Sequence, residues 1–207
     1  YSGHLQCLQF AREHGCPWNN ETTYFAAQSG HVNCLQYALS HGCPVDIRST
    51  NIAGKYCDFA CFELLHQYDA PWNEETAYYA CTSMACLQYL RENGCPWDER
   101  TTERLATEGL VEQLTYAVEH GCPCPSNIVE FCAYSGNLVC LRYLVEDQLK
   151  LLNKEAFIVA LLKGDLMCLQ YLVDQGCPYV GVTFSNTAEQ HIIFDKNKYI
   201  CRLFNIK

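Results

Sequence analysis

The chain repeats itself about every 27 residues, and no other feature of the sequence constrains its fold as strongly. One series is Gly-Cys-Pro, or Asp-Ala-Pro in one repeat, at residues 15–17, 42–44, 69–71, 94–96, 121–123 and 176–178. The other is Cys-Leu-Gln or a close variant, which begins at Cys7, Cys34, Cys61, Cys86, Gln113, Cys140 and Cys168. Two series with one period indicate a solenoid, in which each repeat buries its apolar face only against its neighbours.

Within one repeat, the residues predict a helix, a tight turn, a second helix and a short loop. Asn19 is a favourable N-cap for a first helix that ends at Ser29 and Gly30. Residues 32–41 have the apolar spacing of a second helix, and Pro44 prevents that helix from continuing. We therefore expect an all-α solenoid of stacked helix-turn-helix repeats with short loops.

The stretch from Ala26 to Val45 resembles the core of an ankyrin repeat. An Ala-Ala pair, a Gly-His turn and the glycine that closes the second helix occur in the same order as in that family. The resemblance extends from Ser2 to about Tyr179 and implies a scaffold for protein–protein interaction. The period is about six residues shorter than the family's usual 33 or so. Because the loss falls in the projecting β-turn finger, we expect stubby loops instead of β-hairpins.

The repeat pattern predicts one array over residues 1–179, with six to seven repeats and an incomplete first one. Residues 180–207 are expected to cap the same solenoid, with a last amphipathic helix over 197–204. The chain starts at the end of a first helix and lacks an initiator Met, so we expect the natural protein to continue upstream. Two repeats are irregular: one lacks two residues near Ser83, and another has an extra residue within 150–154.

The net charge and the lengths of the apolar runs argue against two classes of partner. The 14 Lys and Arg against 23 Asp and Glu give a formal net charge of -9, which repels phosphate backbones and anionic lipid headgroups. The longest apolar run, residues 156–162, is far shorter than the roughly 20 residues that span a bilayer. We expect no nucleic-acid partner and no membrane partner.

The 16 cysteines are predicted to be buried, reduced thiols. Ala70, Gln113 and Leu149 stand at equivalent positions of the repeats, and a metal-ligand position would not accept them. We therefore expect no metal, no cofactor and a cytoplasmic, reducing compartment. Cys57 and Cys124 lie outside both series, and for these two the alternative of a zinc or reactive site stays open.

Trp18, Trp72 and Trp97 follow proline in equivalent positions. Such a row could stack ligands, but the replacement of Trp by Val45 and Cys124 in other repeats favours packing between repeats. No local motif for a nucleophile, a phosphate loop or paired carboxylates occurs. We expect no catalytic residue and no small-molecule substrate.

The first-helix positions that change chemistry from repeat to repeat are the predicted partner-binding residues, because positions that need not pack can be selected for binding. They are Tyr24, Gln28, Asn51, Lys55, Tyr78, Glu103 and Tyr134. The chain is accordingly interpreted as a noncatalytic module that binds a protein through its concave first-helix face. Two alternatives are an architectural subunit of a large assembly and a substrate-receptor arm of a ubiquitin-ligase adaptor.

Overall fold

The computed structural model describes residues 3–148 and 152–178, and within these ranges the regular structure is entirely helical. The predicted all-α repeat solenoid is confirmed. The helices are α1 (Leu5–Glu13), α2 (Asn20–Gln28), α3 (Val32–Ser40), α4 (Ile47–Lys55), α5 (Phe59–Gln67), α6 (Glu74–Ala80), α7 (Met84–Glu92), α8 (Glu99–Glu108), α9 (Val111–Glu119), α10 (Ile128–Ser135), α11 (Leu138–Arg142), the π-helix η1 (Tyr143–Asp147), α12 (Lys154–Lys163) and α13 (Leu166–Asp174).

The chain forms two compact units, Tyr1–Thr101 and Thr102–Lys207, whose boundary falls within α8. We call them the N-terminal and C-terminal units and describe each by itself. The capping segment expected over residues 180–207, including the helix expected over 197–204, lies outside the described residues.

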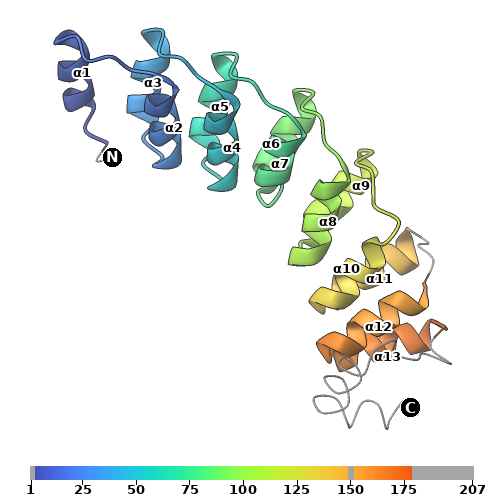
Figure 1. Ribbon diagram of the computed structural model, residues 1–207. Coiled ribbons are helices and arrows are strands. Elements are labelled where there is room, and N and C mark those ends of the chain that lie inside the picture. The colour runs from blue at the N-terminus through green and yellow to red at the C-terminus, as the bar shows by residue number, and fades with distance from the viewer. Residues whose placement is uncertain (1–2, 149–151, 179–207) are drawn as a thin grey trace. The chain divides into compact units, whose positions relative to one another are not determined.

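The N-terminal unit has two layers of helices (Figure 1). The first helices α2, α4 and α6 pack side by side in one layer, and the second helices α1, α3, α5 and α7 form the other. Ala26, Ala53 and Ala80, which the sequence predicted as core, are buried. Gly54 is needed at the α4–α6 contact, since a Cβ there would lie 3.0 Å from the Cβ of Ala80.

The C-terminal unit repeats this arrangement. α10 packs against α12, while α11 contacts α9 and α13. Leu105, Cys132 and Ala160 continue the small or apolar first-helix column and are fully buried. The predicted core column is therefore confirmed in both units.

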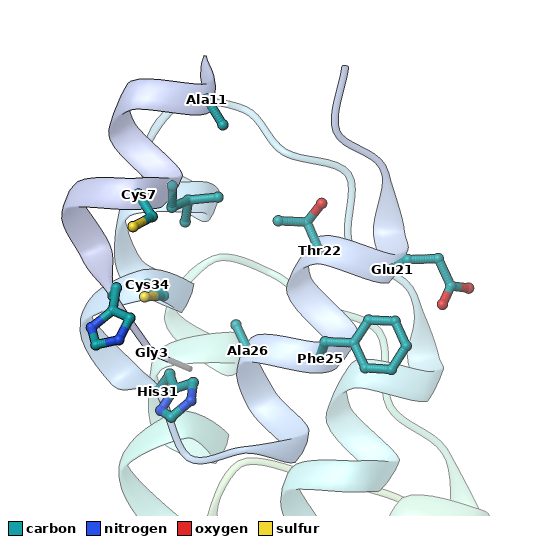
Figure 2. Close-up of a pocket in the computed structure, with 11 residues that line it drawn as sticks. Gly3, Cys7, Ala11, Glu21, Thr22, Phe25, Ala26, His31 and Cys34 are labelled. Carbon is teal, nitrogen blue, oxygen red and sulfur yellow. The ribbon is translucent and has the colours of Figure 1, made fainter. Parts of the chain in front are cut away.

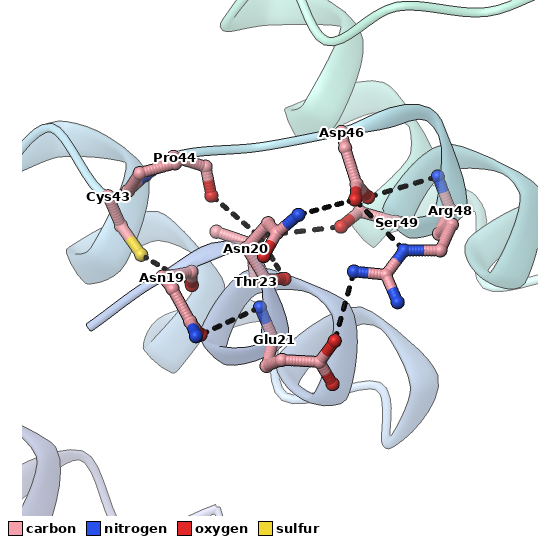
Figure 3. Close-up of polar contacts among 9 residues, drawn as sticks. All are labelled: Asn19, Asn20, Glu21, Thr23, Cys43, Pro44, Asp46, Arg48 and Ser49. Carbon is pink, nitrogen blue, oxygen red and sulfur yellow. Dashed lines mark hydrogen bonds and ion pairs between the residues drawn. The ribbon is translucent and has the colours of Figure 1, made fainter.

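Three of the loops are tied by a hydrogen bond to the first helix of the preceding repeat. The hydroxyl of Thr23 donates to the carbonyl of Pro44 at 2.9 Å (Figure 3). The same bond recurs from Thr50 to Pro71 at 2.9 Å and from Thr102 to Pro123 at 2.7 Å. Because these bonds join consecutive repeats, they fix the spacing of the stack as well as the path of each loop.

Three loop cysteines also make a hydrogen bond to the start of a first helix. The Cys43 thiol donates to the carbonyl of Asn19, the N-cap of α2, with 3.3 Å between Sγ and O (Figure 3). Cys95 and Cys177 make the equivalent bonds to Asn73 and Asn153, at 3.5 and 3.1 Å. A thiol is a weak hydrogen-bond donor, whereas Ala70, at the equivalent position of another repeat, has no side-chain donor.

Burial confirms most of the cysteine prediction and corrects it at the N-terminal edge. The series members from Cys34 to Cys177 that the structure describes are buried, and all described cysteines are free thiols. Cys7 and Cys16 are exposed, so the prediction of burial is wrong for them. Cys7 lines an open pocket between α1 and α2 (Figure 2), and Cys16 lies in the loop that follows α1.

Cys57 takes the position of a turn glycine. Its equivalent one repeat earlier, Gly30, has φ +66°, and Cys57 has φ +54°, the left-handed region that favours glycine. Its exposed Sγ lies 3.3 Å from the hydroxyl oxygen of Thr82. This placement explains why Cys57 falls outside both cysteine series.

The Trp row packs within the structure. Trp72 stacks on His66 of α5 with 4.1 Å between ring centroids, and the guanidinium of Arg12 lies 4.3 Å from the ring centre of Trp18. Each Trp therefore covers the end of a second helix, which agrees with the packing interpretation.

The irregular repeats are absorbed locally. α6 has only 7 residues, and the Ser83 side chain caps α7 by accepting from the backbone N–H of Cys86. The repeat with the extra residue continues α11 as one turn of π-helix, η1.

Two threonines test the loop tie. Thr50→Val removes the donor to Pro71, and we expect the free energy of unfolding to fall by about 1 kcal/mol. Thr101 is the matched control, because its hydroxyl is buried without a hydrogen bond to any described residue. Thr101→Val should leave stability unchanged within about 0.5 kcal/mol or raise it. Chemical denaturation followed by circular dichroism measures both, and equal losses would contradict the tie.

Alkaline pH tests the buried thiols. Burial raises the pKa of the Cys61, Cys95 and Cys168 thiols to about 12, above the ordinary 9.0. Stabilisation from a raised pKa is complete below the unfolded-state pKa and is lost as the pH rises towards the folded-state pKa. We expect the free energy of unfolding, measured under reductant, to fall as the pH rises from about 9 towards 12.

The variant Cys61→Ala should make this decline shallower, since one buried thiol no longer titrates on unfolding. Gln36→Ala, at an exposed side chain that does not titrate, should leave the slope unchanged. A slope that is the same in both variants would contradict the assignment.

Candidate functional site

The first helices of the N-terminal unit enclose an open groove of about 410 Å³. We call it the first-helix groove; it is lined by Tyr24, Arg48, Asn51, Ile52, Lys55, Glu75 and Tyr79. The residues come from α2, α4 and α6, so three successive repeats contribute to one surface. Helical spacing explains the α4 contribution, because residues 48, 52 and 55 are three or four apart and share a face.

Asn51 forms the floor of the groove, where it links α4 to α6. Its side-chain amide donates to Glu75 Oε2 at 3.0 Å, and its Oδ1 accepts from the Thr76 hydroxyl at 2.6 Å. Only 9% of Asn51 is exposed. The predicted partner-binding residue Asn51 therefore uses its hydrogen-bonding atoms to hold two repeats together.

Arg48 forms one rim and is anchored by two carboxylates. Its Nη2 lies 3.0 Å from Glu21 Oε1, its Nε lies 2.9 Å from Asp46 Oδ2 (Figure 3), and its guanidinium is 5.6 Å from the Tyr24 ring centre. Burial raises the pKa of Asp46, but hydrogen bonds from Arg48 and Asn20 outweigh it and hold that pKa below its ordinary value. The cation is thus fixed and largely neutralised.

Lys55 supplies the open charge of the groove. It lies in the last turn of α4, is exposed, and forms no ion pair with any residue that the structure describes. A lysine ammonium offers three donors on a flexible stem. It can therefore meet a carboxylate or another anionic group on a ligand without first breaking an existing ion pair.

Tyr24 and Tyr79 form the aromatic walls, and both are half-buried. Each ring is held by an edge-to-face contact with a neighbour, Phe25 at 5.2 Å and Tyr78 at 5.3 Å between centroids. Tyrosines fixed in this way provide contact area at small entropic cost.

The structure brings together three of the predicted site residues. Tyr24, Asn51 and Lys55 line the groove, whereas Gln28 and Tyr78 are half-buried in the same unit and do not. The other two lie in the C-terminal unit. Glu103 is half-buried there, and Tyr134 is 57% exposed, with Lys163 Nζ 5.8 Å from its ring centre.

Sequence reasoning missed Arg48, Ile52, Glu75 and Tyr79. The signal was present, since Arg48 and Ile52 lie three residues before and one after Asn51 on α4. The prediction compared only equivalent positions of the repeats. The groove is lined by different positions in successive repeats, so this comparison did not find it.

The described residues contain no group of three or more His, Cys, Asp or Glu side chains placed to hold a metal ion. None of the helices in the described ranges has the length and apolar character needed to cross a membrane. The groove itself presents the aromatic rings of Tyr24 and Tyr79, the unpaired ammonium of Lys55 and the hydrogen-bonded carboxylate of Glu75.

No protein-family model and no curated protein sequence matches this chain. Two similar solved structures are the pentatricopeptide repeat protein PPR10 in complex with an 18-nt psaJ RNA element and a form of it with three cysteines replaced by serine. Each is 12% identical with a TM-score of 0.33, over 98% of this chain and 46% of the other. This chain thus spans about half the length of those proteins.

These structures correct one prediction. The exclusion of a nucleic-acid partner is wrong as drawn, because it rested on net charge, and the similar helical-repeat proteins are in complex with RNA. Net charge describes the whole surface, whereas binding depends on the local surface that a ligand meets. At this TM-score the likeness carries no argument about what the present chain binds.

Asn51 and Lys55 differ in their predicted effect on stability. Asn51→Ala removes the acceptor of the buried Thr76 hydroxyl and the amide that donates to the Glu75 carboxylate, and we expect a loss of about 1–3 kcal/mol in the free energy of unfolding. Lys55→Ala, four residues along the same helix, should change it by no more than about 0.5 kcal/mol. Thermal and urea unfolding of the two variants test this. If Asn51→Ala is as stable as the parent chain, the hydrogen bonds of Asn51 do not hold α4 and α6 together.

Proposed function

We propose that this chain is a noncatalytic helical-repeat module that binds a segment of another protein in the first-helix groove. The observation that carries the proposal is the meeting of Tyr24, Lys55 and Tyr79 around one hollow built from three repeats. Fixed aromatic walls beside an unpaired cation suit a polypeptide segment with an apolar side chain next to an acidic one.

The rigid floor supports the same proposal. Asn51, Glu75 and Thr76 satisfy one another across α4 and α6, so the groove exists before a ligand arrives. A preformed site loses less conformational entropy on binding. Contacts of the ligand with the two tyrosines and with Lys55 then supply most of the binding free energy.

We also propose that the repeats are short, ankyrin-like repeats in a reducing compartment. The glycine turn between paired helices and the buried alanine column support the first point. The free thiols support the second.

Site-specific photo-crosslinking tests the function. A crosslinking residue in place of Lys55 should capture a partner directly, whereas the same residue in place of Gln36, exposed on the second-helix layer, should not. The double variant Tyr24→Ala, Lys55→Glu should weaken binding of the captured partner by about 2 kcal/mol, roughly thirtyfold in Kd.

Gln36→Ala with Gln88→Ala is the matched control, since both side chains are exposed on second helices of the same unit. The proposal is supported if the captured partner is a protein, survives nuclease treatment and is retained by the control. Capture of RNA at position 55 would assign the groove to nucleic acid instead. Equal capture at positions 55 and 36 would remove the groove from the function.

A further inference from the structure

The first-helix groove is built at the spacing of the repeats. Its three helices, α2, α4 and α6, pack side by side in one layer (Figure 1), and packed helices have axes about 8–10 Å apart. Tyr24 on α2 and Tyr79 on α6 therefore stand on helices whose axes are roughly 16–20 Å apart. Lys55 lies on α4, the helix between them. A ligand that crosses the groove meets one tyrosine, then the lysine and then the other tyrosine.

A polypeptide in the polyproline II conformation matches this spacing. It has three residues per turn and rises about 3.1 Å per residue, so residues i, i+3 and i+6 share one face at intervals of about 9.3 Å. An extended strand does not match, because its residues i and i+3 point to opposite faces. An α-helix presents a side chain to one face every three or four residues, or about every 5 Å, roughly twice as densely as the three helices can receive them.

The charges around the groove limit how many acidic residues the segment can carry. Arg48 is already paired with the carboxylates of Glu21 and Asp46, at 3.0 and 2.9 Å. The carboxylate of Glu75 adds another negative charge on the groove wall. Of the two cations that line the groove, Lys55 is the one that has no ion pair with a described residue. A segment with a single acidic residue between uncharged ones is therefore attracted to Lys55 and avoids repulsion by the carboxylates.

The floor of the groove favours a backbone with few N–H donors. The Asn51 amide donates to Glu75 at 3.0 Å, and Asn51 Oδ1 accepts from the Thr76 hydroxyl at 2.6 Å. The polar atoms of Asn51 are thus already in use between α4 and α6. Proline has no backbone N–H, so a proline-rich segment places fewer unmatched donors over this floor than other segments do.

We infer that the first-helix groove binds a proline-rich segment in the polyproline II conformation, with one acidic residue three positions from a proline on each side. The two prolines lie against Tyr24 and Tyr79, and the acidic side chain reaches Lys55. Aromatic-lined grooves suit such segments, because the polyproline II backbone is already extended and loses little entropy on binding. The inference rests on the proposed function, since it names the kind of protein segment that the groove takes.

Two peptides of the same composition test the position of the acidic residue. Pro-Ala-Pro-Glu-Pro-Ala-Pro has its glutamate three residues from each terminal proline. Pro-Ala-Pro-Pro-Glu-Ala-Pro keeps both terminal prolines but moves the glutamate by one residue, or about 120° around the segment. Both peptides are blocked at their ends, labelled with a fluorophore and titrated with the full chain by anisotropy. We expect the first to bind about fivefold more tightly, the effect of one exposed ion pair.

A third peptide tests the conformation. Pro-Gly-Gly-Glu-Gly-Gly-Pro keeps the three contact residues and removes the preference for polyproline II. Glycine loses more conformational entropy than other residues when its backbone is fixed. We therefore expect this peptide to bind at least about tenfold more weakly than the first one.

Two lysine variants complete the design. Lys55 and Lys163 are both exposed and lie in the last turn of a first helix, α4 and α12. Lys55→Met should bring the first two peptides to the same affinity, because the charge that distinguishes them is gone. Lys163→Met, outside the groove, should keep the fivefold difference. Circular dichroism checks that both variants are folded.

The inference is supported by a preference for the first peptide that Lys55→Met alone removes, together with weak binding of the glycine peptide. It is overturned if the first two peptides bind the parent chain equally, if the glycine peptide binds as tightly as the first, or if no peptide binds. Photo-crosslinking separates the two proposals. Capture of a protein at position 55 without binding of these peptides keeps the proposed function and overturns only this inference.

Discussion

In three of the described repeats, the hydrogen bond from a first-helix threonine to the proline carbonyl of the next loop holds consecutive repeats together. A repeat of two short helices cannot bury its own apolar face, so it is stable only when its neighbours are held at the correct distance. The bonds from Thr23, Thr50 and Thr102 set that distance. Packing of the alanine column then follows, because small side chains let adjacent helices approach closely.

Threonine is a poor helix former and proline ends helices, yet the repeat places both where they are useful. Each threonine lies in the first turn of its helix. There its hydroxyl donates a hydrogen bond to a loop proline carbonyl, which lies outside any helix. Loop cysteines contribute a weaker bond to the starts of α2, α6 and α12. Loop and helix therefore depend on each other across the repeat boundary.

The sequence was sufficient to predict the helices, their caps and the buried alanine column, because these depend on residues close together in the chain. Asn19 and Asn73 cap α2 and α6 as their spacing indicated. The site was predictable only in part. Whether Asn51 points to solvent or to α6 depends on the rotation of one helix against the next, and no local pattern records that rotation. The exposure of Cys7 likewise depends on which helices pack against α1.

The repeat that contains η1 shows how an irregular length is confined to one repeat. Although this repeat has one extra residue, α12 and α13 after it keep the capped starts and buried columns of regular repeats. An insertion or deletion in such an array therefore alters one repeat instead of shifting the frame of all that follow. Gene segments that encode single repeats can be duplicated, lost or exchanged during evolution with a fold still available to the product.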